Sequence, residues 1–459
     1  MSRRNRLRNA PRRSSKFLKY FFVTLVVATV AATALAAYIL FEREVPELVL
    51  EQDLYYLGGK IELPLQVTDR KSGIRSITIT LNQDQKTAVL LEKTFPRQAW
   101  LTTAGPDTVR EKVVIDAKAA GFAEGEAELL VSVRDFSLSG TLRGNLAEQR
   151  IPVMIDTTPP RVSINHAHRY IRPGGTGIAV YTVSEPPARH GVMIDSTFFP
   201  GAPLSGKDSY IAYFALPWDA EAPKSTMVMA TDAAGNEGTA PFATTFRTVA
   251  DKRDTLTISD QFLQRKLPEF EERYPEMRGT LLEQFLFLNN QVRIENNNLI
   301  AEVCATSEPH RLWSDRFLRM PGAKRAGFAD QRTYVYNGEV VDAQTHLGVD
   351  IASTQHADVR AANRGKVVFA EYLGIYGNVV ILDHGQGVFS LYSHLSSFET
   401  TLGALVEKDD SIGRTGVSGM AGGDHLHFSM LIHGIFVTPL EWWDQNWIDV
   451  NIQNILNEQ

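Results

Sequence analysis

Four residues with metal-binding side chains occur in two short groups near the end of this 459-residue chain. His346 and Asp350 form an H-x-x-x-D group, and His425 and His427 form an H-x-H group about eighty residues later. In both groups polar residues alternate with apolar ones, so on a β-strand the polar side chains share one face. Two such strands can direct their donors at one point. Three nitrogen or oxygen ligands with a fourth position left to water are typical of a catalytic zinc site.

We therefore predict His346, Asp350 and His427 as ligands of a Zn²⁺ cofactor, because imidazole and carboxylate groups suit this ion. His425 shares a strand face with His427 and is placed to act as a base. His394 shares a strand face with Tyr392 in another apolar stretch. The remaining histidines lack this coupling. His384, in the turn sequence D-H-G-Q-G, is expected to be structural, and the pair at 166 and 168 is expected in a solvated loop.

The first nineteen residues contain eight Lys or Arg and no acid, although the chain as a whole has a net charge of -6. Such a basic block can bind nucleic acid. Here it precedes Tyr20–Phe41, an uncharged apolar run of 22 residues, which is long enough to cross a membrane as a helix. The positive-inside rule then keeps the N-terminus in the cytoplasm. We expect a single-pass protein of the inner (cytoplasmic) membrane, with its bulk in the periplasm or outside the membrane, and no nucleic-acid partner.

A cleaved signal peptide is the alternative for this segment, because Ala34-Leu35-Ala36 resembles an A-x-A cleavage site. The apolar run continues beyond this position, which favours an uncleaved anchor. In both cases most of the chain is exported. Cys304 is the only cysteine, so an intramolecular disulfide is impossible, and a buried apolar role is expected.

The predicted fold class is mainly β. Short alternating runs separated by turn residues predict a β-sandwich over 44–156 and a second over 157–250. The second begins with D-x-T-P-P and ends with T-D-A-A-G-N, and in this it resembles bacterial immunoglobulin-like modules. Helical spacing then predicts a connector over 254–310. The last region, 311–459, is β-rich and contains all the candidate metal ligands.

Two apolar stripes mark the predicted connector. Leu263, Leu267 and Phe270 form part of the first, and Leu281, Phe285 and Leu288 form part of the second. Such stripes usually pack against a core or a neighbouring domain. We expect the connector to position the C-terminal domain.

Residues 344–439 resemble the lysostaphin-type zinc endopeptidases that cut peptidoglycan peptides. The resemblance rests on the stretches THLGVDIA, VRAANRGKVVFAEYLGIYGNVVILDHGQG, LYSHL, SIGRTGVSG and GDHLHFSM, in this order. It implies an antiparallel β domain with its site in a groove. It also implies a role for seven residues. His346, Asp350 and His427 would bind zinc, His394 and His425 would be catalytic, and Tyr376 and Asn378 would line the groove and contact the substrate.

The expected chemistry is peptide hydrolysis. A zinc ion lowers the pKa of its bound water, His425 would accept the proton from that water, and His394 would donate a hydrogen bond to the oxyanion. The resemblance implies an endopeptidase that acts on stem peptides or crosslinks, and the apolar run over 20–41 predicts that it is membrane-anchored. Its expected partners are peptidoglycan, the cytoplasmic membrane and cell-wall proteins that bind the sandwiches.

Two alternatives remain. The first is a regulator: members of the family that lack metal ligands activate other wall hydrolases. A complete site can also be blocked by a segment of its own chain, and residues 305–345 are the candidate for such a segment. The sandwiches could instead carry the function, with the last domain anchoring the protein to glycan.

Overall fold

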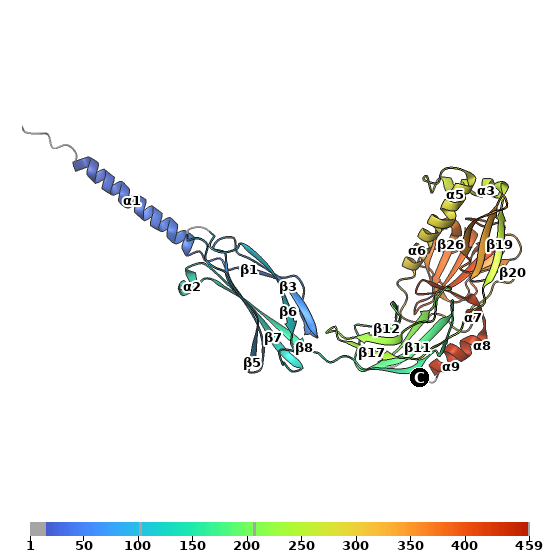
Figure 1. The fold of residues 1–459 in the computed structure, drawn as a ribbon, viewed down its shortest axis with the longest axis horizontal. Helices are drawn as coiled ribbons and strands as arrows, with labels where there is room; N and C mark the ends of the chain where they lie inside the picture. Colours follow the sequence, from blue (N-terminus) through green and yellow to red (C-terminus); the bar gives the residue numbers. More distant parts are fainter. Residues whose placement is uncertain (1–14, 101–102, 205–207, 458–459) are drawn as a thin grey trace, which may run out of the picture. The chain divides into compact units, whose positions relative to one another are not determined.

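The computed structural model describes residues 15–100, 103–204 and 208–457, which form two compact units. The first unit contains residues up to 158 together with 233–236, and the second contains 159–232 and 237–459. Strands predominate in both units, as predicted (Figure 1). The site residues all belong to the second unit.

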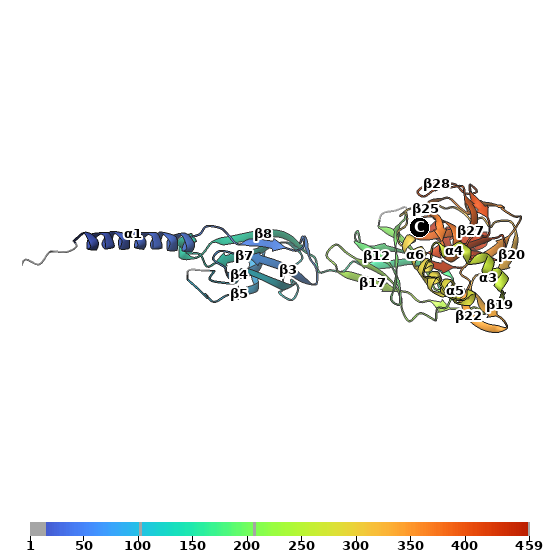
Figure 2. The same cartoon turned by 90° about the horizontal axis from the view of Figure 1, so that it is seen from above.

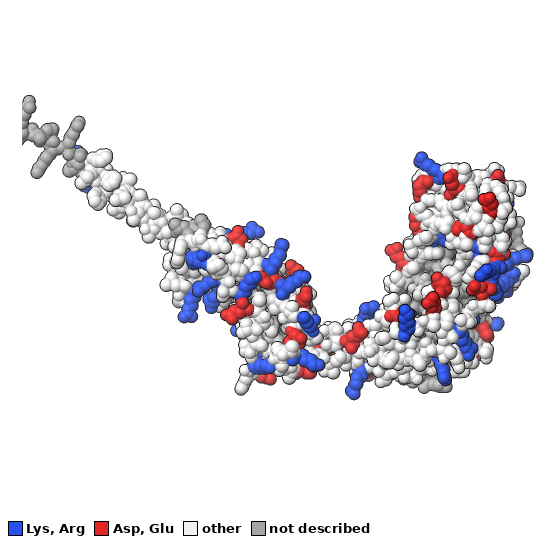
Figure 3. Space-filling view, viewed as in Figure 1, with Lys and Arg blue, Asp and Glu red and all other residues white. Residues whose placement is uncertain are grey.

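The N-terminal apolar run forms helix α1 (Ser15–Leu40). Residues 16–40 of this helix are long and apolar enough to cross a membrane, a property that a signal sequence also has. Figure 3 shows no charged side chain along its middle. The predicted helix is therefore confirmed, and its membrane insertion remains a prediction.

The first unit also contains two sheets that enclose one apolar core. One sheet has the strand order β1-β3-β6, and the other has the order β2-β8-β7-β4-β5. Alternate side chains of β4, among them Ile77, Ile79 and Leu81, are fully buried. The strands are β1 (Glu47–Leu50), β2 (Tyr56–Leu57), β3 (Lys60–Thr68), β4 (Ile74–Gln83), β5 (Lys86–Thr94), β6 (Thr108–Asp116), β7 (Gly125–Asp135) and β8 (Leu146–Ile155), with a short α2 (Ser139–Leu142).

The second unit begins with two four-stranded sheets, of orders β14-β15-β11-β9 and β13-β12-β16-β17, and a small β10-β18 pair. Their strands are β9 (Val162–Ala167), β10 (Tyr170–Ile171), β11 (Thr176–Val183), β12 (Arg189–Ile194), β13 (Thr197–Pro200), β14 (Ala202–Pro203), β15 (Ser209–Ala215), β16 (Thr226–Thr231), β17 (Glu237–Pro241) and β18 (Thr245–Phe246). The arrangement contains the predicted strands, and its immunoglobulin-like character remains a prediction. His166 lies on β9 and His168 is buried, with Nε2 3.0 Å from the carbonyl oxygen of Asn451, so the prediction of a solvated loop pair is wrong.

The region expected to be a helical connector begins with a strand, β19 (Lys252–Ile258), before α3 (Asp260–Lys266), α4 (Pro268–Glu271), α5 (Leu281–Phe287), η1 (Leu288–Val292) and α6 (Arg293–Val303). Strand β19 pairs in parallel with β21 (Asp330–Tyr336), so its hydrogen-bonding partner is far away in the sequence. Ser259 caps α3 and Thr280 forms a capping box at α5. The apolar stripes of these helices are buried against the C-terminal sheet, as predicted, in a core that also contains Cys304 (Figures 1 and 2).

The C-terminal region contains two sheets. A three-stranded sheet has the order β19-β21-β22, with β22 at Glu339–Thr345. The larger sheet has the order β20-β23-β30-β27-β26-β25-β28, and β24, β29 and β31 pair at its sides. Its strands are β20 (Ala323–Ala326), β23 (Val349–Ala352), β24 (Asp358–Arg360), β25 (Gly365–Leu373), β26 (Gly377–Asp383), β27 (Val388–Phe398), β28 (Leu405–Val406), β29 (Ser411–Thr415), β30 (Leu426–Ile432) and β31 (Ile435–Val437). Short helices follow: η2 (Gly374–Tyr376) inside the sheet region, then α7 (Pro439–Trp443), α8 (Gln445–Ile448), η3 (Asp449–Gln453) and α9 (Asn454–Asn457).

The second sandwich and the C-terminal sheet share one hydrophobic core. Strand β15 is almost completely buried, and its Tyr213 packs against Trp442 of α7. The carboxylate of Glu441 is buried at this junction, where it accepts hydrogen bonds from the guanidinium of Arg172 and the backbone N–H of Thr176. The sandwich therefore forms a structural base for the domain that carries the site.

Candidate metal centre

Neighbouring strands of the large sheet bring the predicted ligands together. Asp350 of β23 is directly opposite His427 of β30, and His427 is directly opposite Ser393 of β27, next to His394. His346 follows β22 and precedes β23, so the turn between the two sheets places it beside both ligands. The period-2 alternation along β23 and β30 thus directs Asp350 and His427 to one position. His346 lies before β23, so the prediction that it shares a strand face with Asp350 is wrong, and the turn places it there instead.

Three donor atoms form a nearly equilateral triangle at this position. His346 Nε2, Asp350 Oδ1 and His427 Nδ1 lie 2.9 Å from one another. Ligand atoms at 2.0–2.1 Å from a tetrahedral zinc ion are about 3.3 Å apart. The three separations in the triangle are slightly shorter than this, so the three atoms can form one face of a tetrahedral zinc site after a small outward movement.

The remaining nitrogen of each histidine determines its tautomer. His346 Nδ1 donates to the carbonyl oxygen of Gly327, 2.7 Å away. Ser429 Oγ donates its own proton to the carbonyl of Leu347, so it accepts from His427 Nε2. Each histidine consequently presents a lone pair toward the carboxylate oxygen. Three such atoms at 2.9 Å repel one another unless a cation lies between them, so the donor set fits a metal ion.

The second oxygen of Asp350, Oδ2, forms an ion pair with an arginine side chain. Arg332 Nη2 of β21 lies 2.8 Å from Asp350 Oδ2, which leaves Oδ1 directed at the histidines. Burial raises the pKa of Asp350, but its histidine neighbours outweigh this effect and hold the pKa well below its usual range. The carboxylate is therefore charged and oriented, as a metal ligand requires.

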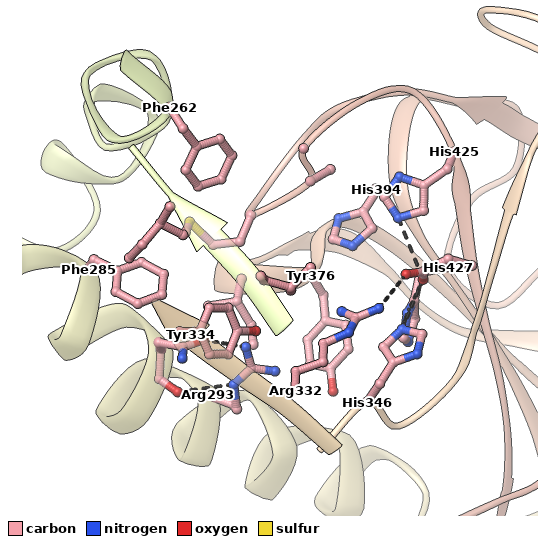
Figure 4. Close-up of a pocket in the computed structure, with 18 of the residues that line it drawn as sticks. Phe262, Phe285, Arg293, Arg332, Tyr334, His346, Tyr376, His394, His425 and His427 are labelled. Atoms are coloured by element: carbon pink, nitrogen blue, oxygen red, sulfur yellow. Dashed lines mark hydrogen bonds and ion pairs between the residues drawn. The ribbon is translucent and has the colours of Figure 1, made fainter. Parts of the chain in front are cut away.

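Two further histidines face the same position. His394 Nδ1 and His425 Nδ1 lie 2.8 Å from the carbonyl oxygens of Ser418 and Gly423, so each uses this nitrogen as a donor. Their rings are 4.9 Å apart, and His425 Nε2 is 3.6 Å from Asp350 Oδ1. Nε2 of His394 faces the cavity, and Nε2 of His425 is directed at Asp350 beside the metal position (Figure 4). A neutral imidazole of this tautomer accepts a proton at Nε2, and only the protonated form donates from it.

Residues 344–439 match the family model described as peptidase family M23. This match covers the positions that form the triangle and both further histidines. The segment is a peptidase family M23 domain.

Two curated proteins are each similar to this chain over 95 residues. The DD-carboxypeptidase/endopeptidase Mpg of Neisseria meningitidis serogroup B is 40% identical over 95 residues, which is 21% of this chain and 22% of that protein. The murein hydrolase activator EnvC of Escherichia coli is 34% identical over 95 residues, 21% of this chain and 23% of that protein. Alignment to the solved catalytic domain of lysostaphin from Staphylococcus simulans gives 26% identity over 27% of this chain and 92% of that domain, with a TM-score of 0.23. The chain thus spans less than a quarter of the length of these two curated relatives.

A cavity of about 350 Å³ opens beside the triangle and extends past the M23 domain. One side is formed by the histidines, and the opposite side by residues of β19, α3, α5 and α6 (Figure 4). Tyr376 lines the cavity, with its ring centre 5.8 Å from that of His427. Its hydroxyl donates to Asn297 Oδ1 of α6, so the helices outside the family domain orient a side chain of the site.

Asn378 has a different place from the one expected. It is absent from the residues that line this cavity, and its side-chain amide donates to the carbonyl of Leu395, 2.9 Å away. Its backbone N–H donates to Ser418 Oγ. These bonds hold β26, β27 and the loop after Thr415 together, so Asn378 supports the wall of the groove. His384 is fully buried and bonds to Arg364 O and Ser390 Oγ, as expected for a structural residue.

Sequence reasoning missed the two arginines of the cavity, Arg332 and Arg293, and the glycine beside the ligands. A Cβ on Gly348 would lie 2.5 Å from His427 Nε2 and 2.6 Å from Ser429 Oγ. For Gly348 the sequence contains one indication of a role in the site, its position between the predicted ligands His346 and Asp350. For the arginines the sequence contains no such indication, because their role depends on contacts between distant segments.

Proposed function

We propose that this protein is a zinc-dependent endopeptidase that hydrolyses peptide bonds of peptidoglycan stem peptides or crosslinks. The observation that carries the proposal is the triangle of His346, Asp350 and His427, whose fixed tautomers call for a cation, beside an open cavity. The names of the related proteins, which include DD-endopeptidases, support the substrate class.

A zinc ion bound there would supply a water molecule of lowered pKa and polarise the scissile carbonyl. The chain contributes a proton acceptor and a proton donor at the two Nε2 atoms of His394 and His425. Burial and the neighbouring histidines lower the pKa of His394 well below its usual value. Burial also lowers the pKa of His425, but the Asp350 carboxylate raises it more.

In the metal-free site these directions would make His394 the acceptor and His425 the donor, the reverse of the roles expected from the sequence. An ion on Asp350 would offset part of the effect on His425. Both histidines therefore stay assigned to catalysis, and the division of their roles is tested separately below.

The substrate is tested with purified peptidoglycan. Wild-type protein is expected to release peptides whose masses identify one cleaved bond, and His394→Ala is expected to release them far more slowly at the same zinc content. Intact peptidoglycan after incubation with the zinc-loaded wild type would reject the proposed activity.

We further propose that α1 anchors the protein in the cytoplasmic membrane, with a cytoplasmic N-terminus and the two units outside. The basic residues before the helix and its uncharged length support this. Membrane fractionation with protease protection tests it. A soluble chain that begins near residue 37 would instead indicate a cleaved signal peptide.

Self-restraint or a regulatory role is the second candidate. Arg332 belongs to the segment predicted to block the site, and its guanidinium reaches the carboxylate of Asp350. Removing residues before 310 cannot test this, because the helices of that region share a core with Phe389 and Leu391. The substitution Arg332→Gln in the whole chain tests it instead: restraint predicts a higher rate, whereas support of the metal ligand predicts weaker zinc binding.

A further inference from the structure

One end of the cavity lies outside the M23 domain and carries an unneutralised positive charge. Arg293, the first residue of α6, lies across the cavity from the histidines, close to Tyr334 and Phe285 (Figure 4). Its Nε and Nη2 donate to the backbone and side-chain oxygens of Asn289, at 3.0 and 2.5 Å. These two bonds fix the plane of the guanidinium at the cavity wall.

Arg293 has no ion pair with a carboxylate within residues 15–100, 103–204 and 208–457. It is half-buried, and a guanidinium removed from water without a counter-ion is unfavourable. Its two bonds to Asn289 are to neutral oxygens, and the nearest carboxylate along this network, Asp342, is bonded to the amide of Asn289 and not to the guanidinium. An anion from outside the protein would supply the missing partner.

A second guanidinium reinforces this charge. Arg332 lies between Arg293 and the histidines, and its buried Nε has no hydrogen-bond partner in the described part of the chain (Figure 4). Asp350 is the only carboxylate that lines the cavity as the structure describes it, and one of its oxygens faces the metal position. The lining therefore carries two guanidiniums for one carboxylate, before any metal charge is added.

The part of the cavity wall that β19, α3 and α5 form is apolar. Its lining residues are Leu256, Ile258, Phe262 and Phe285. A ligand that suits this end of the cavity combines an aliphatic portion with a negatively charged group. Guanidinium groups bind carboxylates in a bidentate, planar manner, which adds geometric selectivity to charge.

We propose that Arg293, assisted by Arg332, binds a free carboxylate of the peptide substrate and thereby selects peptides that carry one at a fixed distance from the scissile bond. This inference rests on the proposed peptidoglycan endopeptidase function. Stem peptides and their crosslinks contain free carboxylates and short aliphatic side chains, which match the two kinds of surface. Because Arg293 lies in α6, the specificity comes from the helices and not from the family domain.

The test compares two synthetic crosslinked stem-peptide dimers in the zinc-loaded full-length chain. One dimer has free carboxylates, and the other has every carboxylate converted to a carboxamide. The wild type is expected to prefer the acid in kcat/KM by about 10- to 100-fold, the range of one hydrogen-bonded charge pair. Arg293→Gln should abolish this preference by raising KM for the acid.

Two variants control for unrelated effects. Arg293→Lys keeps the charge without the planar fork and should restore part of the preference. Arg278→Gln removes an exposed arginine of the same helical region, whose Nε donates to the carbonyl of Pro275, and should behave as the wild type.

Binding of both dimers to the metal-free protein, measured by titration calorimetry, separates this inference from the proposed function. Tighter binding of the acid that depends on Arg293, without cleavage of either dimer by zinc-loaded protein, would keep the carboxylate site and reject the endopeptidase. Cleavage of both dimers with the same preference in the wild type and in Arg293→Gln would overturn the carboxylate site and leave the endopeptidase in place.

Discussion

The two ring nitrogens of each histidine in the site have different partners, and this asymmetry determines what each ring can do. In His346 and His427 one nitrogen donates to an oxygen of the protein, and the other presents a lone pair to the metal position. In His394 the lone-pair nitrogen faces the cavity instead, and in His425 it is directed at Asp350 beside the metal position. In all four rings one nitrogen thus donates to the protein, and it is the place of the other nitrogen, inside or outside the triangle, that separates the ligands from the proton-transfer groups.

The pH dependence of single-histidine variants distinguishes the roles of His394 and His425. If His394 is the acceptor, it must be neutral, so the residual kcat/KM of His425→Ala should rise as pH increases through the lowered pKa of His394. If His425 is the donor, it must be protonated, so the residual rate of His394→Ala should fall as pH increases through the raised pKa of His425.

Zinc content is measured at each pH as the control, because proton competition at the ligands also lowers the rate in acid. The opposite slopes, a falling rate in His425→Ala and a rising rate in His394→Ala, would restore the roles expected from the sequence.

Gly348 lets the backbone approach the ring of His427 closely, because glycine has no side chain. The methyl group of Gly348→Ala would collide with His427 Nε2 and Ser429 Oγ, and so disturb the hydrogen bond that fixes the tautomer of this ligand. We expect zinc affinity to fall by about 10- to 100-fold, as for other losses of support around a metal ligand. Competition with a zinc chelator measures the change, and Gly59→Ala, at an open position without a positive φ, is a control for the general effect of substitution at a glycine. Unchanged affinity in Gly348→Ala would show that the contact is not limiting.

At the scale of elements, the helices before the M23 domain hold a loop of the site. Lys266 Nζ of α3 donates to the carbonyl of Val417, and Glu269 Oε1 of α4 accepts from the N–H of Gly419. Lys266 and Glu269 also form an ion pair, and Lys266 is buried. The residue between these two anchors is Ser418, whose carbonyl accepts from His394 Nδ1. The pair therefore positions His394 from outside the family domain.

Loss of this anchor should lower kcat without changing KM. In Glu269→Ala the N–H of Gly419 loses its acceptor and Lys266 loses its counter-ion, so we expect kcat to fall by about 10- to 100-fold. Glu269→Gln keeps an acceptor oxygen and should recover part of the rate. Glu271→Ala, an exposed residue of the same helix, is the control. Equal kcat values in Glu269→Ala and Glu271→Ala would contradict the positioning role.

The sequence predicted the strands of the M23 domain and the convergence of the ligand positions because both follow from local alternation of polar and apolar residues. It did not predict that residues 252–258 form a strand, since β19 is mostly exposed and pairs with β21 across a long stretch of chain. Arg293, Arg332 and Lys266 were missed for the same reason. Their partners, Asn289 and Glu269 apart, are distant in the sequence, and an isolated arginine or lysine on a helix or strand usually faces solvent.

At the scale of the whole molecule, the second sandwich and the M23 domain are joined by a common core, whereas the first sandwich has a core of its own. Tyr213 and Trp442 meet in the common core, and the buried Glu441 is satisfied by donors from the sandwich. The second sandwich therefore cannot be removed without exposing apolar surface and a buried carboxylate.

Calorimetry of the whole chain should show two unfolding transitions, one for each unit, and not three. Leu63→Ala removes a buried side chain of the first unit and should lower only one Tm, and Trp442→Ala should lower only the other. Each substitution is expected to cost about 2–5 kcal/mol. A separate third transition for residues 159–250 would show that the second sandwich is an independent domain.

Metal analysis of the purified full-length chain tests the central claim most directly. After reconstitution and removal of free metal, the wild type should retain about one zinc ion per chain and cleave purified peptidoglycan, whereas His427→Ala should retain almost none and be inactive. A wild-type chain that holds no zinc after reconstitution, or a His427→Ala variant that cleaves peptidoglycan as fast as the wild type, would contradict the assignment of this site.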